Sequence, residues 1–383
     1  MSLFLLTGAS GVVGSAIVPA LLTRSDAEIL LLLRPGDRGV TARLETLSKF
    51  WCRHYPELDA SNLATRVRAC VGDIAEPALG LGDETHRLLR DRCTHIIHCA
   101  ASVRMNLPLD DARRSAVEPV AQILRLAEVL PKLRKIEFVS TVGVGGRRIE
   151  PLPETWLDTP PNDFHNSYEA AKYEAEVLIR QAVEAGIPAT VHRPSMVIGD
   201  SRHGAVIHFQ IFYFLCEFLS GRRTAGFYPA LGAATLDTIP NDIVANAIVA
   251  AASDTATTGR ILHLCAGPSR ALELRALRAL VRSRFRAAGR LPRFLPNQEL
   301  PVSVFVGCLQ ALAPVLPRSV RRGLGTLPLY LDYLAGRQVF ENAASVRWMA
   351  TRDLSLPSVS PSLERALDFY LRDQASGGKR PAD

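Results

Sequence analysis

The sequence predicts an α/β protein in which a doubly wound parallel sheet is followed by a smaller, mostly helical C-terminal region. Short apolar segments of strand type alternate with longer segments in which apolar residues recur at helical spacing. A glycine-rich turn separates the first apolar segment from the first helical one. Such alternation is typical of parallel sheets with helices on both faces, which bind ligands beyond the carboxyl ends of the strands.

The predicted strands are short, and the second is purely apolar. Ile29–Leu33 contains only leucine and isoleucine, which fits a strand buried on both faces of a sheet. Before residue 200 we expect strands at Leu3–Leu6, Ile29–Leu33, Val67–Val71, His95–Cys99, Ile136–Ser140 and Ala189–His192. The longer helical segments between them are Val12–Thr23, Ala112–Leu130 and Tyr168–Ala185.

Beyond residue 200 the alternation is less regular. Ala205–Leu219 is apolar and aromatic, and Asn241-Asp242 is expected to cap a helix at Ile243–Ala252. The segments that follow are a strand at Ile261–Cys265, arginine-rich helical segments from Leu272 to Ala288, and apolar helical ones from Val302 to Leu334.

Gly8, Gly11 and Gly14 define the first turn. They have the spacing G-x-x-G-x-x-G between a strand and a helix, rather than the commoner G-x-G-x-x-G. Gly8 permits a tight turn, Gly11 lets a phosphate approach the backbone, and Gly14 lets the helix pack closely on the strand. The free N–H groups at the start of that helix would bind an anion. The alternative is a strand–turn–helix without a ligand.

Composition and charge exclude several classes of protein. Of 383 residues, 48% are hydrophobic and 22% charged, which favours a large core over disorder. The net charge of +7 suits an acidic ligand such as a nucleotide or phosphopantetheine, but no nucleic-acid motif is present. The seven cysteines form neither C-x-x-C nor a metal-binding pattern, so we expect no metal and a reduced, cytoplasmic protein. We expect neither a signal peptide nor a spanning helix.

Tyr168 and Lys172 are four residues apart in a predicted helix, which places them on one face. An ammonium beside a phenol favours the phenolate, so we expect Lys172 to lower the pKa of Tyr168. Such a tyrosine can donate a proton to a carbonyl oxygen while a hydride reaches the carbonyl carbon. The alternative is an ordinary surface helix with a tyrosine–lysine pair.

Five segments occur in the order found in one enzyme family. They are Thr7–Gly14, His98–Val103, Val139–Thr141, Ser167–Lys172 and His192–Ser201. Together they resemble the extended short-chain dehydrogenases/reductases, and among these the branch of thioester reductases and fatty acyl-CoA reductases. The R-P-S-x-V-x-G-D-S segment is the more discriminating one, and Leu236–Val244 resembles a D-x-x-P-x-D-x-V segment of the same branch. The resemblance covers roughly residues 1–265.

The resemblance implies NADP(H) as cofactor and Thr141, Tyr168 and Lys172 as catalytic residues. Ser140 is the second candidate for the hydroxyl at Thr141, and strand-end capping is the alternative role for both. The resemblance assigns cofactor contacts to Thr7, Gly8, Ser10, Gly11, Val12, Val13, Gly14, Arg34, Arg43, Asp73, Ile74, Ala100, Ala101, Ser102, Lys172, Pro194, Met196 and Val197. We accordingly expect a Rossmann domain at 1–200 with return segments at about 236–266, a substrate-binding region at 201–375, and a disordered tail at 376–383.

The implied reaction is reduction of an acyl thioester to an aldehyde, or onward to an alcohol. These 383 residues contain neither an adenylation nor a carrier domain that we recognise, so we expect acyl-CoA or an acyl carrier domain to act in trans. A second hypothesis is a dehydrogenase or epimerase acting on a ketone, a hydroxyl or a nucleotide-sugar. A third is an NADP-binding sensor or scaffold, against which the Tyr168–Lys172 pair argues.

Arg34 follows the second predicted strand, 20 residues after Gly14. An acidic residue at this place binds the ribose 2′-hydroxyl of NAD, whereas arginine suits the 2′-phosphate of NADP. Arg43 is expected to assist; the alternative for Arg34 is a solvent-exposed strand end. Asp73 is expected to contact adenine or to form a turn after its strand.

Other candidates receive structural interpretations. Cys99 is expected to be an inert buried thiol, and His192 and Arg193 to fix the loop after the sixth strand. The arginines of 275–293 form either a solvated face or a docking surface for an acidic carrier domain or CoA. Val302–Leu316 and Leu324–Leu334 are expected in the core or a lid, with shallow membrane contact as the alternative.

Overall fold

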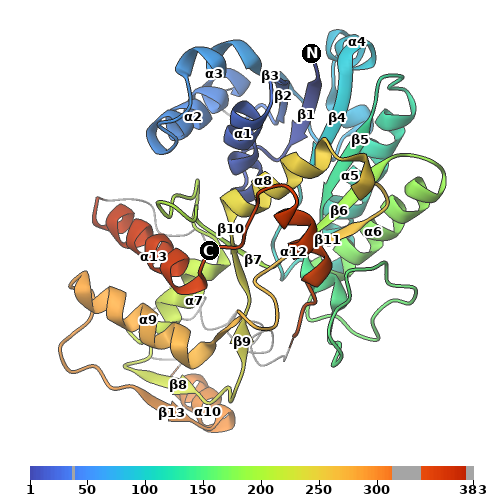
Figure 1. The fold of residues 1–383 in the computed structure, drawn as a ribbon. Coiled ribbons are helices and arrows are strands. Elements are labelled where there is room, and N and C mark those ends of the chain that lie inside the picture. The colour runs from blue at the N-terminus through green and yellow to red at the C-terminus, as the bar shows by residue number, and fades with distance from the viewer. Residues whose placement is uncertain (37–38, 313–337, 377–383) are drawn as a thin grey trace.

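Seven parallel strands form the central sheet of this computed structural model, which describes residues 1–36, 39–312 and 338–376 (Figure 1). They are β1 (Leu3–Thr7), β2 (Glu28–Leu33), β3 (Val67–Val71), β4 (Cys93–His98), β5 (Lys135–Val139), β6 (Ala189–Pro194) and β11 (Ile261–Leu264). Their order across the sheet is β11-β6-β5-β4-β1-β2-β3. The chain therefore runs outwards from β1 to β3 and restarts at β4 on the other side of β1. This order confirms the doubly wound fold and places a ligand crevice at the carboxyl ends of β1 and β4.

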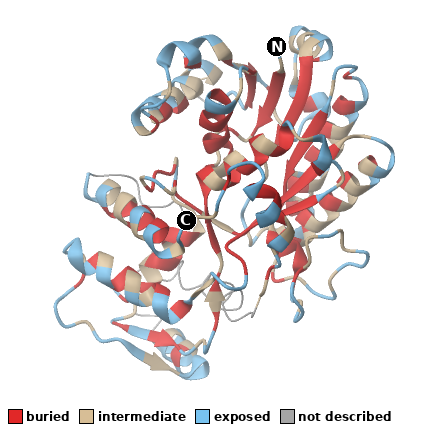
Figure 2. Ribbon diagram, viewed as in Figure 1, coloured by how far each residue is buried: buried red, intermediate tan, exposed pale blue. Residues whose placement is uncertain are grey.

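Helices cover both faces of the sheet. One face carries α1 (Val12–Arg24), α2 (Gly39–His54), α3 (Ala60–Arg66) and α8 (Asn241–Ala252), and the other carries α4 (Asp83–Arg92), α5 (Leu109–Glu128) and α6 (Ser167–Glu184). Alternate side chains of β1 enter the two cores, Phe4 and Leu6 on the α1 face and Leu3 and Leu5 on the α5 face. Since both faces are buried (Figure 2), the strand is apolar up to Thr7 at its end.

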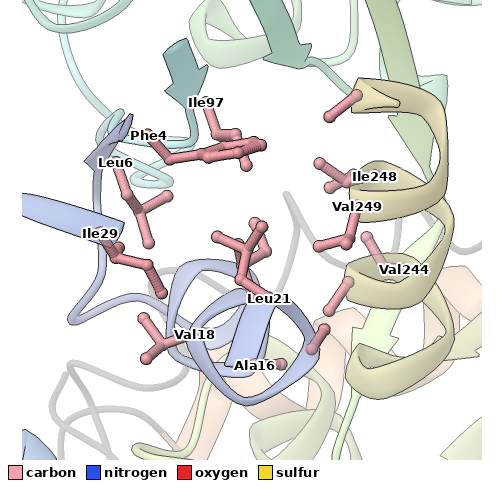
Figure 3. Close-up of a cluster of buried hydrophobic side chains, with 14 of the residues drawn as sticks. Phe4, Leu6, Ala16, Val18, Leu21, Ile29, Ile97, Val244, Ile248 and Val249 are labelled. Carbon is pink, nitrogen blue, oxygen red and sulfur yellow. The ribbon is translucent and has the colours of Figure 1, made fainter. Parts of the chain in front are cut away.

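The core on the α1 face joins segments that are far apart in the chain. Phe4 and Ile29 of the sheet meet Leu21 of α1, with Ile248 of α8 opposite (Figure 3). Through α8 and β11 the chain thus returns to the sheet after residue 240. The expected cap of this helix is wrong: α8 begins at Asn241 after Pro240 and has no side-chain cap.

A third apolar core lies beside the sheet in Figure 1 and packs α7 (Ile211–Leu219), α9 (Leu274–Ala287) and α13 (Val359–Ala375) together. Phe212, Phe285 and Leu363 are fully buried there. Strand β7 (Met196–Ile198) pairs with β10 (Thr238–Pro240) on the way into this region. Its remaining elements are β8 (Phe227–Pro229), β9 (Thr235–Leu236), β12 (Leu272–Glu273), β13 (Gln298–Leu300) and α10 (Val302–Leu312); α12 (Ala343–Ala350) packs beside β11.

The predicted strands match the observed ones to within two residues at each end. One boundary matters: β4 ends at His98, so Cys99 lies in the following loop and not in the strand. Helices α2, α3, α4, α7, α12 and α13 were not predicted. In α2 only Leu47 and Trp51 are buried, so its apolar spacing is too sparse to stand out from a surface segment.

Some predicted features lie outside the described residues: the apolar segment Leu324–Leu334, the end of Val302–Leu316 and all but the first residue of the tail at 376–383. Within the described part of the chain, no helix combines the length and the apolar character needed to cross a membrane.

Candidate active site

The glycine turn touches the loop that follows β4. Gly8 has a φ of +77°, and a Cβ added to it would lie 2.7 Å from Ala100 N. A Cβ on Gly14 would lie 2.1 Å from the carbonyl oxygen of Gly8. Gly11 N donates to that oxygen at 2.8 Å, and no described side chain caps the start of α1 at Gly11. The first N–H groups of α1 are therefore available to an anion, in a cradle that larger residues would fill.

Thr7 ties the same two loops together. Its buried hydroxyl lies 2.8 Å from His98 Nδ1 and accepts a hydrogen bond from Ala100 N at 3.3 Å. Burial, aided by the charge of Lys172, lowers the pKa of His98 to about 3, so its imidazole is neutral. Thr7 thus positions the half-buried Ala100–Ser102 segment beside the turn. Ser10, Val12 and Val13 belong to the turn or the start of α1.

Arg34 and Arg43 come together where β2 leads into α2. Arg34 is exposed directly after β2, and Arg43 Nη1 donates to its carbonyl oxygen at 3.0 Å. Asp73 follows the neighbouring β3; its carboxylate accepts from Ala75 N at 3.1 Å, so it does form a turn. Ile74 beside it is half-buried.

Thr141 and Tyr168 meet beyond the carboxyl end of β5. Thr141 Oγ1 accepts from Gly143 N at 3.1 Å at the start of the short turn Val142–Gly145, and its side chain interacts with the Tyr168 phenol. Burial and then the charge of Glu169 raise the pKa of Tyr168 to about 12, which the Thr141 interaction opposes. The runner-up hydroxyl, Ser140 Oγ, is buried and has no hydrogen-bond partner among the described residues.

Lys172 lies one turn after Tyr168 on α6 and is buried. Its Nζ donates to Val139 O at 2.6 Å and stands 4.4 Å from the centre of the Phe138 ring. Burial lowers its pKa to about 8, against the opposing charge of Glu176. The expectation that Lys172 would lower the pKa of Tyr168 is wrong for this structure, because burial and the charge of Glu169 raise that pKa and the ammonium is directed at the backbone of β5.

His192 and Arg193 hold neighbouring elements, not the loop after β6 as expected. His192 Nε2 lies 2.6 Å from Glu137 Oε2 of β5. On the other side of β6, Arg193 makes a bidentate ion pair with Glu176, with Nη2 and Oε2 2.7 Å apart. Because Glu176 is one turn after Lys172, this buried pair fixes the helix that carries Tyr168 and Lys172.

The segments His192–Ser201 and Leu236–Val244, which carry the most specific part of the family resemblance, are hydrogen-bonded to each other. Ser201 N and Oγ donate to the Asp242 carboxylate at 2.8 and 2.6 Å, and Asp237 accepts from Ala266 N and Gly267 N. Pro194 ends β6, while Met196 and Val197 are half-buried in β7, where Met196 pairs with Thr238. The conspicuous acidic residues of these motifs are therefore structural.

The arginine-rich surface is partly neutralised. Arg275 and Arg278 both bind Glu299, Arg284 binds Asp368, and Arg282 is buried against Tyr228. The described residues place no carboxylate at ion-pair distance from Arg286, Arg290 and Arg293. Next to them Phe294 is 88% exposed.

Neither Cys99 nor a group of metal ligands is arranged for catalysis in the described part of the chain. Cys99 is half-buried, and burial raises the pKa of its thiol to about 12, against reactivity as a nucleophile. In the part of the chain that the structure describes, no three His, Cys, Asp or Glu side chains are grouped as metal ligands.

Sequence reasoning missed His165 and Glu169, which flank Tyr168. Asn166 Oδ1 accepts from Glu169 N at 3.0 Å, and the Glu169 carboxylate accepts from His165 N at 3.0 Å. The N-x-x-E spacing of Asn166–Glu169 is that of a capping box, which could have located the helix start and this carboxylate.

Comparison with known proteins adds independent evidence. The profile of the family described as "Male sterility protein" matches residues 6–248. Isonitrile lipopeptide synthase of Streptomyces coeruleorubidus is 32% identical over 64% of the chain, and carboxylic acid reductase of Mycobacterium tuberculosis is 31% identical over 52%. The chain spans only 16% and 18% of these two relatives' own lengths.

Solved structures are similar over nearly the whole chain. The terminal R domain from the myxalamid PKS-NRPS biosynthetic pathway is 27% identical, with a TM-score of 0.80, and the match covers 100% of this chain and 93% of that one. UDP-glucose 4-epimerase of Thermotoga maritima shares the fold alone, at 15% identity, a TM-score of 0.60, and coverage of 97% and 99%.

Proposed function

The chain belongs to the family described as "Male sterility protein", which consists of nicotinamide-binding extended short-chain dehydrogenases/reductases, and from this premise we propose that it reduces an acyl thioester to an aldehyde with NADPH. The observation that carries the proposal is the interaction of Thr141 with Tyr168 beyond the carboxyl end of β5, where the buried Lys172 donates to Val139 O. The names of the relatives, a lipopeptide synthase and a carboxylic acid reductase, support this substrate class.

In the proposed reaction, Thr141 and Tyr168 hold the carbonyl oxygen of the thioester. The cofactor, when bound, supplies a hydride for the carbonyl carbon. The two hydroxyls stabilise the negative charge that develops on the oxygen, and Tyr168 Oη transfers its proton to it. Lys172, one turn further along α6, would favour the phenolate once it has formed, although in this structure its ammonium is hydrogen-bonded to Val139 O and does not lower the pKa of Tyr168. The hemithioacetal then loses its thiol, which leaves an aldehyde; a second round on that aldehyde would give an alcohol.

The residues present fit a nicotinamide dinucleotide. The Gly8–Gly14 cradle and the uncapped start of α1 would hold its pyrophosphate, because the N–H groups there lack side-chain partners. Ala100–Ser102 and Pro194–Val197 would line the crevice, with Asp73 and Ile74 near the adenine. The adjacent Arg34 and Arg43 suit the 2′-phosphate and so favour NADPH over NADH.

We propose that the acyl group arrives on CoA or on a carrier domain in trans. The named relatives are much longer than this chain, and one is a lipopeptide synthase. Arg286, Arg290 and Arg293, which lack carboxylate partners among the described residues, would attract the phosphate of pantetheine or an acidic carrier surface. The arginines paired with Glu299 and Asp368 contribute less, because their charge is already compensated.

A second candidate is a dehydrogenase or epimerase acting on a ketone, a hydroxyl or a nucleotide-sugar. The same three side chains would serve it, and the epimerase has the same fold. Purified chain should be tested with NADPH against acyl-CoAs, acyl carriers, ketones and nucleotide-sugars. NADPH oxidation with thioesters alone supports the proposal; turnover of ketones or sugars without any thioester reduction would replace it with the second candidate.

A further inference from the structure

Glu169, the residue after Tyr168, is buried with only 1% of its surface exposed. Its Oε2 accepts from both N and Nδ1 of His165, each at 3.0 Å. Gln338 Nε2 lies 3.2 Å from the same Nδ1 and 3.4 Å from Nε2 of His165, and it donates to Gly146 O at 3.4 Å. The carboxylate is therefore held by His165, which precedes the helix and lies beside a residue remote in sequence.

The other side of Glu169 lies against the turn that carries Thr141. A Cβ added to Gly143 would come within 3.0 Å of Glu169 Cγ and 3.2 Å of Oε1. Gly143 in turn donates its N–H to the Thr141 hydroxyl at 3.1 Å. Contacts thus run from the helix start through Glu169 and Gly143 to Thr141, and Thr141 interacts with Tyr168.

Helix capping alone does not explain this arrangement. In a capping box one carboxylate oxygen accepts from the N–H of the N-cap residue, whereas Oε2 of Glu169 accepts from N and Nδ1 of His165, the residue before the N-cap Asn166. Oε1 is buried and has no hydrogen-bond partner among the described residues, which is a costly state for a carboxylate oxygen. It lies instead at the packing contact with Gly143.

We propose that Glu169 is a positioning residue, which holds the Thr141 turn and the Tyr168 phenol at their working separation by packing against Gly143 while His165 anchors it. The inference rests on the proposed function, in which Thr141 and Tyr168 act on one carbonyl oxygen. Displacement of such groups by about 1 Å can cost about a hundredfold in rate. The charge of Glu169 also raises the pKa of Tyr168, so that the phenol keeps its proton until the reaction.

The test shortens the side chain of residue 169 and enlarges that of residue 143. Glu169→Asp draws the carboxylate away from Gly143, and Gly143→Ala adds a methyl group where Glu169 already packs. Each should lower kcat by about tenfold to a hundredfold, with KM and the Kd of NADPH changed less than about threefold. The double variant restores the total volume, so its kcat should exceed that of either single variant.

Two substitutions complete the design. Glu169→Gln keeps the length of the side chain, so it should retain kcat within about fivefold if packing is what matters. Glu174→Gln is the matched control, because Glu174 lies on the same helix and pairs with Arg113 at the surface; it should leave kcat unchanged.

Several results would overturn the inference. If the two single losses multiply in the double variant, Glu169 and Gly143 act independently. If the variants lose thermal stability but keep kcat, Glu169 only stabilises the helix start. If kcat falls as far in Glu169→Gln as in Glu169→Asp, the length of the side chain does not determine kcat. A wild-type chain that reduces no carbonyl compound rejects the proposed function itself, which separates that failure from these.

Discussion

Tyr168 lies in the first turn of α6, between the capping residue Asn166 and the buried Glu169. The phenol has its pKa raised to about 12, while the buried Lys172 has its pKa lowered to about 8. Both shifts arise first from burial, which disfavours the charged form of each group. A phenol that keeps its proton at neutral pH is a suitable donor to a carbonyl oxygen.

Removal of the phenol hydroxyl tests the proposed proton donor. Tyr168→Phe should lower kcat by about a hundredfold to ten-thousandfold, the usual contribution of a general acid, and leave the Kd of NADPH unchanged. Tyr173→Phe, on the same helix, is the control and should keep full activity. Steady-state kinetics and fluorescence titration measure both; near-normal kcat in Tyr168→Phe would exclude the assignment.

The titration of Lys172 predicts a pH dependence. Since the ammonium is the form that stabilises the phenolate, kcat/KM should fall as the pH rises through about 8, where the buried amine loses its proton. Lys172→Arg should move this fall to higher pH, because a guanidinium stays charged throughout the accessible range. A pH profile measured from 6 to about 10 checks this. An alkaline limb at the same pH in both proteins would show that another group titrates.

Arg34 provides a test of coenzyme choice. A charged hydrogen bond to the 2′-phosphate contributes about 1.5–3 kcal/mol, or roughly tenfold to 150-fold in affinity. Arg34→Ala should therefore weaken NADPH by this factor and leave NADH nearly unchanged. Arg68→Ala, at an exposed arginine of the neighbouring β3, is the control. Equal weakening of both coenzymes would contradict the role.

At the scale of elements, α6 and the β1–α1 turn determine the site. Tyr168, Lys172 and Glu176 recur every four residues and so form one stripe of α6, which the Arg193 ion pair fixes on β6. The turn depends on the absence of side chains, since any Cβ at Gly8 or Gly14 would meet backbone atoms at less than 3 Å.

Gly14→Ala tests this dependence. The added methyl group would lie 2.1 Å from Gly8 O, so the start of α1 must shift. We expect a loss of about 1–3 kcal/mol of unfolding free energy, as for overpacked cores, together with weaker NADPH binding. Gly307→Ala in α10, where an added Cβ meets nothing within 4 Å, should change neither the unfolding free energy nor NADPH binding. Unchanged NADPH binding in a folded Gly14→Ala protein would refute the cradle.

At the scale of the whole molecule, the sheet was predictable and the rest much less so. Runs such as Ile29–Leu33 are apolar because both faces of the strand are buried, and such runs can be read without knowing their neighbours. The surface helices α2 and α4 bury few residues and give a weak pattern. Spacing suggested Tyr168 and Lys172, and the observed contact with Thr141 fits that reading without testing their roles.

Contacts between distant segments could not be predicted. Glu169 packs against Gly143 and is bound by His165, which lies beside Gln338, 173 residues further along the chain. Likewise, the hydrogen bond from Ser201 to Asp242 joins two motifs that lie 41 residues apart in the chain. Only the three-dimensional structure shows that these motifs are in contact. The pKa of Tyr168 was misjudged for the same reason, because spacing gives the nearby charge but not the degree of burial.

The most direct test of the central claim follows both products of thioester reduction. Purified chain is given an acyl-CoA or acyl carrier and NADPH that carries deuterium at the transferable C4 position, and free thiol is titrated while an aldehyde trap captures the product. The account predicts about one thiol per NADPH consumed to form the aldehyde, with deuterium on the former carbonyl carbon. NADPH consumption without thiol, or an aldehyde without deuterium, would contradict it.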